Sequence, residues 1–151
     1  MPAPWWVPGY QRSTLMSEWL PPTVLAFLFW GVWAFLPKLT LRYIDPRSAI
    51  VYEAMGGLLI ALVVLVLMAF KPAAEPRGIV LAVATGALGV AGALAYLYAM
   101  RTGPVAPVAT ISALYPLLAI VLAGLVLREP VSLKQGVGIV LGLIAMALIG
   151  A

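Results

Sequence analysis

The sequence contains no cysteine and no histidine, and it is poor in charge. Without cysteine the chain can form neither disulfides nor thiolate sites, and without histidine it lacks the commonest general base and metal ligand. Lys and Arg number 9 and Asp and Glu number 5, so that 9% of the 151 residues are charged while 64% are hydrophobic. This composition excludes an ordinary soluble domain and most hydrolase and metalloenzyme mechanisms. We therefore expect no enzymatic activity, no cofactor and no metal.

Long apolar runs account for this composition and for the mean hydropathy of +1.10. They span residues 21–37, 48–70, 78–100, 102–127 and 135–151, and a single charge, Glu53, lies inside them. A helix needs about 20 apolar residues to cross a bilayer. The sequence therefore predicts an all-α polytopic membrane protein with five transmembrane helices, placed in the cytoplasmic (inner) membrane and surrounded by lipid.

The N-terminal segment differs in composition from the rest of the chain. Residues 1–19 are predicted to be a flexible tail, and residues 20–151 to form the five-helix transmembrane domain. Translation that begins at Met16 instead of Met1 would remove most of this tail.

Capping residues and helix breakers predict where the later helices begin and end. Asp45 can cap the second helix, with Pro46 in its first position. Gly103 is placed to terminate the third helix. Ser132 and Gln135 have the spacing of a capping box at the start of the fifth helix.

The basic residues stand singly at the ends of the apolar runs, too sparse for a nucleic-acid partner. Five crossings put five of them on one side of the membrane and four on the other. The first group is Arg12, Lys71, Arg77, Arg128 and Lys134, and the second is Lys38, Arg42, Arg47 and Arg101. This weak bias barely selects an orientation. Both a single orientation and dual topology, with an antiparallel homodimer, remain open.

Small residues at a spacing of four mark faces on which membrane helices pack closely. Such pairs are Gly57 with Ala61, and Gly138 with Gly142 in the last span. Packing within one chain is the favoured interpretation. A dimer face, formed by Gly138 and Gly142, is the alternative.

Glu53 is an acid within an apolar span, where a carboxylate costs about 3 kcal/mol on insertion scales. One interpretation is coupling, in which Glu53 exchanges a proton or attracts an ion. The other is structural, in which Glu53 pairs with Lys38, Arg42 or Arg47.

The first span begins at Pro21 or Pro22 by its composition and must continue to about Leu41 to cross the membrane. It then carries Pro37 and Lys38 at its end. A proline kink frees a carbonyl for other partners, so that Lys38 is a candidate for a transport path. A lysine that extends to the membrane surface is the alternative.

Two groups of side chains are further candidates for a substrate path. Trp30 and Trp33 share one side of the first span, and Tyr96 is the weaker choice in the third. Thr110 and Tyr115 lie in the fourth span, which Pro107 and Pro116 are expected to kink. For Thr110 and Ser112, hydrogen bonds back to their own helix are the alternative.

Two stretches resemble the EamA domain of the drug/metabolite transporter superfamily. They are LFWGVWAFLPK in the first span and the segment from AYLYAMRTGPVAP to the C-terminus. The shared features are the WG followed by a lysine, a proline within span four, and the acid Glu129 in LREPVSLKQ before a glycine-rich last helix.

The resemblance implies a secondary transporter or exporter of small metabolites that performs no covalent chemistry. Larger members carry two five-helix units in inverted orientation, whereas this chain has one, which implies a homodimer. The family's path through helices one, three and four favours Trp30, Trp33, Lys38, Tyr96, Thr110 and Tyr115. A membrane subunit that stabilises a partner is the alternative function. A four-helix multidrug exporter fits less well, because its acid lies in the first span.

Overall fold

The computed structural model describes residues 12–128 and 130–150. It is 84% helical, and the described residues contain no strand. The helical segments long and apolar enough to cross a membrane are Glu18–Thr40, Pro46–Leu67, Pro76–Thr102 and Val105–Leu127, and Leu133–Ile149 is a shorter apolar helix. The prediction of an all-α, five-helix polytopic membrane protein is confirmed.

The chain forms two structural units, Met1–Leu36 and Pro37–Ala151. The first contains most of α1 (Arg12–Thr40), and the last turn of α1 belongs to the second. The helix begins at Arg12 and not at Pro21, because residues 12–20 include no proline or glycine to stop it. The two possible translation starts stay untested.

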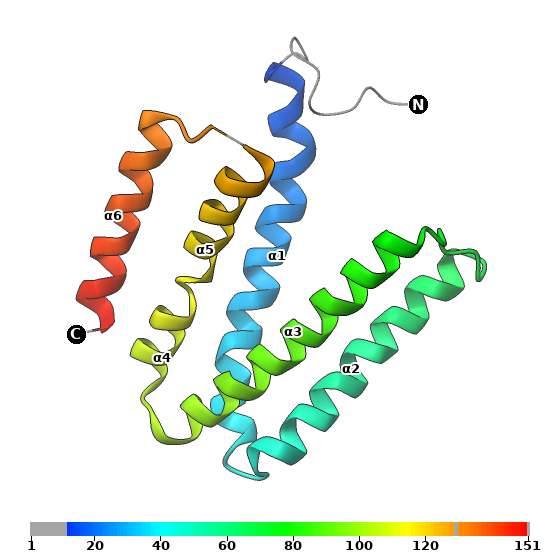
Figure 1. Cartoon of the computed structure of the whole chain (residues 1–151). Coiled ribbons are helices and arrows are strands. Elements are labelled where there is room, and N and C mark those ends of the chain that lie inside the picture. The colour runs from blue at the N-terminus through cyan, green and yellow to red at the C-terminus, as the bar shows by residue number, and fades with distance from the viewer. Residues whose placement is uncertain (1–11, 129, 151) are drawn as a thin grey trace. The chain divides into compact units, whose positions relative to one another are not determined.

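The second unit is a series of helices joined by short turns (Figure 1). Along the chain they are α2 (Pro46–Leu67), α3 (Pro76–Thr102), α4 (Val105–Ser112), α5 (Tyr115–Leu122), the π-helix η1 (Ala123–Leu127) and α6 (Leu133–Gly150). Helices α2 and α3 lie side by side, as do α4 and α6. The fourth predicted span is therefore built from three consecutive helical pieces.

The predicted helix caps are present. The Asp45 carboxylate accepts hydrogen bonds from the backbone amides of Arg47 at 2.9 Å and Ser48 at 3.3 Å. At the start of α6, the Ser132 amide donates to Gln135 Oε1 at 2.8 Å, and the Gln135 amide donates to Ser132 Oγ at 3.3 Å. These bonds satisfy amides that have no partner within a helix.

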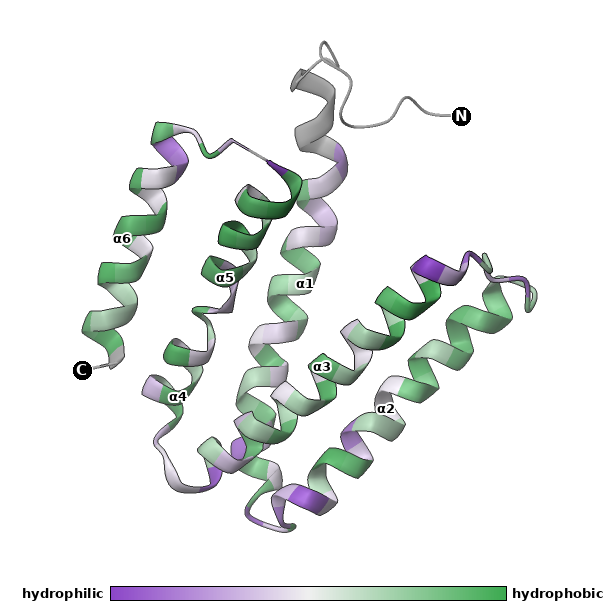
Figure 2. Ribbon diagram, viewed as in Figure 1, coloured by the Kyte–Doolittle hydropathy of each residue, from purple (hydrophilic) through white to green (hydrophobic). Residues whose placement is uncertain are grey.

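Helix α2 is shorter than the predicted span, which extended to Phe70. It ends at Leu67 because Ala69 and Phe70 adopt φ values of 51° and 58°, in the left-handed region. Hydrophilic residues concentrate near helix ends and turns in the second unit, whereas the helix bodies are largely hydrophobic (Figure 2). That distribution is expected for helices whose middle parts face lipid.

The best-buried residues gather at one corner of the second unit. There the last turn of α1, the start of α2 and the end of α3 meet. Leu97 and Met100 on α3 are 0% exposed, and Ala49 on α2 is 1% exposed. Pro37 and Pro46 are buried with them. This corner fixes the position of the polar groups described next.

Candidate functional site

Lys38 lies at this buried corner and is itself half-buried. Its ammonium donates to the carbonyl of Met100 at 3.0 Å and to the carbonyl of Gly103 at 2.8 Å. Both acceptors are at the C-terminal end of α3, where carbonyls lack helical partners and the helix dipole favours a cation. The Lys38 ammonium therefore caps α3 from a distant part of the chain.

The sequence explains why these two carbonyls need an outside donor. In a helix each carbonyl accepts from the amide four residues later. Those residues are Pro104 for Met100 and Pro107 for Gly103, and proline has no amide hydrogen. Lys38 supplies the missing donor to both carbonyls. The spacing of four would have revealed the acceptors in the sequence, but it could not reveal the donor.

The turn between α3 and α4 is also sterically tight. The Gly103 amide donates to the Ala99 carbonyl at 2.8 Å, which confirms Gly103 as the terminator of α3. A Cβ added to Gly103 would lie 2.6 Å from Val108 Cγ2 and 3.0 Å from the Ala99 carbonyl oxygen. A glycine is needed here because of this close approach and not because of its φ, which is −90°.

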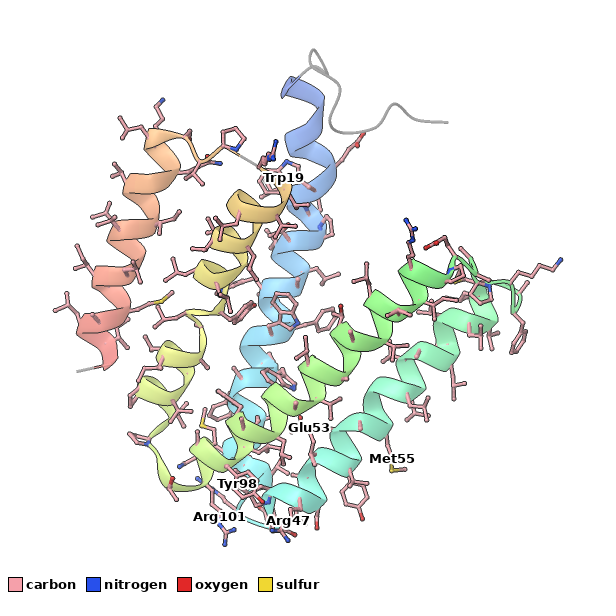
Figure 3. All side chains as sticks on the ribbon, in the orientation of Figure 1. Trp19, Arg47, Glu53, Met55, Tyr98 and Arg101 are labelled. Atoms are coloured by element: carbon pink, nitrogen blue, oxygen red, sulfur yellow. The ribbon has the colours of Figure 1, made fainter. Side chains whose placement is uncertain are left out.

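Polar groups extend around the same corner (Figure 3). Arg47, Tyr98 and Arg101 lie where α2 begins and α3 ends. Arg47 Nε donates to the Tyr98 hydroxyl at 3.1 Å. Hydrogen bonds from the Ser48 hydroxyl and from backbone amides lower the pKa of Asp45, which lies in the turn before α2. The corner thus ties α2 to α3 through an exposed bond as well as through buried side chains.

Glu53 occupies the face of α2 that is directed toward α3 (Figure 3). It lies seven residues after Pro46 and four after Ala49, on the same side of the helix, and it is half-buried. Met55, two residues later, is 55% exposed and points away. The hydrogen bonds of Lys38 and Arg47 described above go to α3. Both interpretations of Glu53, coupling and pairing with a basic residue, stay predictions.

The fourth span breaks at residues 113–114, between α4 and α5. Pro116 cannot donate to the Ser112 carbonyl. The Leu114 amide instead donates a hydrogen bond to the Ile111 carbonyl at 3.1 Å, and the Leu117 amide donates to the Leu114 carbonyl at 3.0 Å. The predicted kink is therefore confirmed at Pro116, near the middle of the span.

These shifts change the hydrogen-bond pattern of the break. In a regular helix the amides of Leu114 and Leu117 would donate to the carbonyls of Thr110 and Ala113, but here they donate to the carbonyls of Ile111 and Leu114. Carbonyls at membrane depth must face protein or water, because lipid cannot bond to them.

Candidate side chains from the sequence border the break. The Ser112 hydroxyl donates to the Ala109 carbonyl at 2.9 Å, which confirms the local alternative for that residue. Thr110 is half-buried, and Tyr115, directly before Pro116, is 59% exposed. The structure thus brings Thr110 and Tyr115 to one discontinuity in the fourth span.

Comparison with known families identifies the chain. The model of the EamA-like transporter family matches residues 19–151. The chain belongs to the EamA-like transporter family. No curated protein and no solved structure matches it. Membership confirms the resemblance seen in the sequence and supports a transporter-like role for this EamA-like protein.

The other predicted residues of the EamA-like chain are dispersed. Trp30 and Trp33 belong to the first unit and are 60% and 40% exposed. Tyr96 is buried on α3, in the second unit. Their assignment to a substrate path stays a prediction, and Glu129 lies outside the described residues.

Two of the small-residue pairs lie in open space in the described structure. A Cβ added to Gly57, Gly138 or Gly142 would meet no atom of the described residues within 4 Å. Both interpretations of the spacing, packing within one chain and a dimer face, stay predictions.

Proposed function

We propose that this EamA-like chain is a secondary transporter of small solutes in the cytoplasmic membrane, working as a homodimer by alternating access. The observation that carries the proposal is the break in the fourth span. Discontinuous helices at membrane depth are how secondary transporters place backbone groups against solutes and ions. A helix that only faces lipid would not contain such a break, because lipid cannot form hydrogen bonds with interrupted backbone.

The homodimer follows from what the described chain leaves open. The interrupted backbone at the break needs cover from lipid, and the glycine faces are of the kind that membrane helices use for close association. A second copy, parallel or antiparallel, provides both at once. In the antiparallel case the two chains reproduce the inverted repeat that larger transporters encode in one chain.

Glu53 is the proposed coupling group. An ionisable residue within a membrane span is costly and usually functional. Its position on α2, toward α3, keeps it on a helix–helix face and not on the opposite, outer face. Exchange of a proton at this carboxylate would couple solute movement to a gradient.

The test uses purified protein reconstituted in liposomes, with solute-induced currents measured over a panel of metabolites. Gly142→Ile fills the open face of α6, so that we expect at least tenfold weaker dimerisation and a matching loss of current. Its melting temperature should be unchanged, because a Cβ added to Gly142 would meet no atom of the described residues within 4 Å. Ala147→Ile, on the other side of α6, is the matched control and should behave as wild type.

Two outcomes would overturn the proposal. Full transport by a demonstrated monomer would remove the dimer. A protein that moves no solute alone, but restores activity to an added membrane partner, would make it a non-transporting subunit.

A further inference from the structure

Guanidinium groups gather at the end of the α2–α3 pair that carries the buried corner. Arg42 lies in the turn before α2, Arg47 in the first turn of α2, and Arg101 in the last turn of α3. All three side chains are exposed. The acid in this turn is Asp45, whose carboxylate accepts hydrogen bonds from the Arg47 and Ser48 amides and from the Ser48 hydroxyl. Positive charge therefore exceeds negative charge at this end.

Tyr98 links two of these arginines across the helix pair (Figure 3). Its hydroxyl accepts from Arg47 Nε at 3.1 Å. Arg101 follows Tyr98 by three residues, so that both side chains lie on one face of α3. Tyr98 thus holds one guanidinium and lies beside the other. The bond occupies Nε of Arg47 and not its two terminal nitrogens, which carry four further N–H donors.

The helix dipoles indicate an anion at this place. The N-terminal end of a helix is positive, so that a cation in the first turn is disfavoured and an anion is favoured. The dipole therefore explains a cation at Arg101, at the C-terminal end of α3, but not one at Arg47. An anion bound beside Arg47 would offset this disadvantage. Arginine forks match the oxygens of carboxylates and phosphates.

Both arginines lie at the level of one membrane surface, which indicates where the anion comes from. Arg47 directly follows the first residue of the span Pro46–Leu67, and Arg101 directly precedes the last residue of the span Pro76–Thr102. Spans end at the polar headgroups of the bilayer. Tyr43, in the turn before α2, is 85% exposed, as expected for a tyrosine at the membrane interface. The anion present at this level is the phosphate of a phospholipid.

We propose that Arg47 and Arg101 bind the phosphate of an anionic phospholipid, whose headgroup bridges α2 and α3 at the membrane surface. The two unesterified oxygens of a phosphodiester match two guanidinium forks. Basic groups between membrane helices are suited to anionic headgroups. A zwitterionic lipid has the same phosphate, but its own ammonium weakens the attraction. The site does not depend on the transport proposal, because it needs no solute.

The test compares dioleoylphosphatidylglycerol with dioleoylphosphatidylcholine, which have the same acyl chains. The full chain in neutral detergent at fixed ionic strength is melted with either lipid and followed by circular dichroism. At a lipid concentration of about 100 times Kd, we expect phosphatidylglycerol to raise the melting temperature by at least about 5 °C more than phosphatidylcholine. Equal shifts would overturn the inference. A shift of the same size with sn-glycerol 3-phosphate would do so too, because the site would then be one for soluble phosphate.

The location is tested at the two ends of the same helix pair. Arg47→Gln combined with Arg101→Gln removes two charges at the site. Lys71→Gln combined with Arg77→Gln is the matched control, because it removes two exposed charges at the opposite end of α2 and α3. We expect the first double variant to lose the preference for phosphatidylglycerol and the second to retain it.

Equal losses in the two double variants would overturn the location, because the lipid would then respond to the net charge of the chain. An unchanged preference in Arg47→Gln with Arg101→Gln would overturn it as well. The comparison of lipids on the wild-type chain decides the chemistry even if a variant does not fold.

Discussion

Lys38→Met removes the ammonium that joins the last turn of α1 to the end of α3. The methionine has a similar length and apolar character but no donor, so that the Met100 and Gly103 carbonyls lose their partner. Neither carbonyl can find a replacement in a helical amide, because Pro104 and Pro107 occupy the required positions. The variant therefore measures what this contact contributes to the corner.

The magnitude follows from two hydrogen bonds that share one charged donor. A hydrogen bond to a charged group contributes about 1.5–3 kcal/mol. The two bonds share one donor, and Lys38 is only half-buried. We therefore expect the free energy of unfolding to fall by about 2–4 kcal/mol, which is less than twice the contribution of one such bond. For a chain of this length each kcal/mol lowers the melting temperature by about 2–4 °C. The expected decrease is thus about 5–15 °C.

The assay is thermal unfolding in detergent, followed by circular dichroism. Lys71→Met, an exposed lysine in the turn after α2, is the control and should melt within about 2 °C of wild type, as surface substitutions do. Lys38→Arg should retain part of the stability, since the guanidinium also donates. If Lys38→Met melted with the control but abolished solute currents, the capping argument would be refuted and Lys38 would belong to the substrate path.

Three further predictions address other parts of the chain. Gly103→Ala should lower unfolding stability by about 1–3 kcal/mol through overpacking, and Val108→Ala in the same chain should restore part of it in the same melting assay. Hydrogen bonds from Ser48 and the backbone lower the pKa of Asp45 in the folded chain, so that its stabilising charge is fully present above the unfolded pKa and lost as pH falls through the folded one. The melting-temperature difference between wild type and Asp45→Asn should accordingly be constant well above the ordinary pKa of an aspartate and shrink as the pH falls below it; a constant difference at all pH values would contradict the lowered pKa. Glu53→Gln should retain solute exchange but lose the pH dependence of solute currents, and an unchanged pH profile would remove the coupling role.

Helices and their caps were predictable because their signals are local. A carboxylate at Asp45 needs only the amides two and three residues later, and Ser132 needs only Gln135. Gly103 and Pro116 act on carbonyls four residues before them. Each of these residues acts on backbone groups within one helical turn, so that the sequence alone predicts where the helix begins, ends or breaks.

The contacts that build the corner were not predictable in the same way. Lys38 bonds to residues 62 and 65 positions later in the chain. Its interpretation from the sequence rested on position near a kink, and position says nothing about which helix lies opposite. The glycine spacing is limited in a related way, because it predicts a face on which a helix can pack closely but not which helix packs there.

Two nearby parts of the chain use proline to interrupt a helix, and the second of them gives a final test. At the end of α3 the Lys38 ammonium donates to the carbonyls that Pro104 and Pro107 cannot serve. At the break between α4 and α5, Pro116 cannot donate to the Ser112 carbonyl, and the helix is interrupted near the middle of the span. If the break exists for transport, it lowers the stability of the protein, as functional sites commonly do. Pro116→Ala should then melt higher than wild type while it loses solute currents. A lower melting temperature would mean instead that the break is needed for packing.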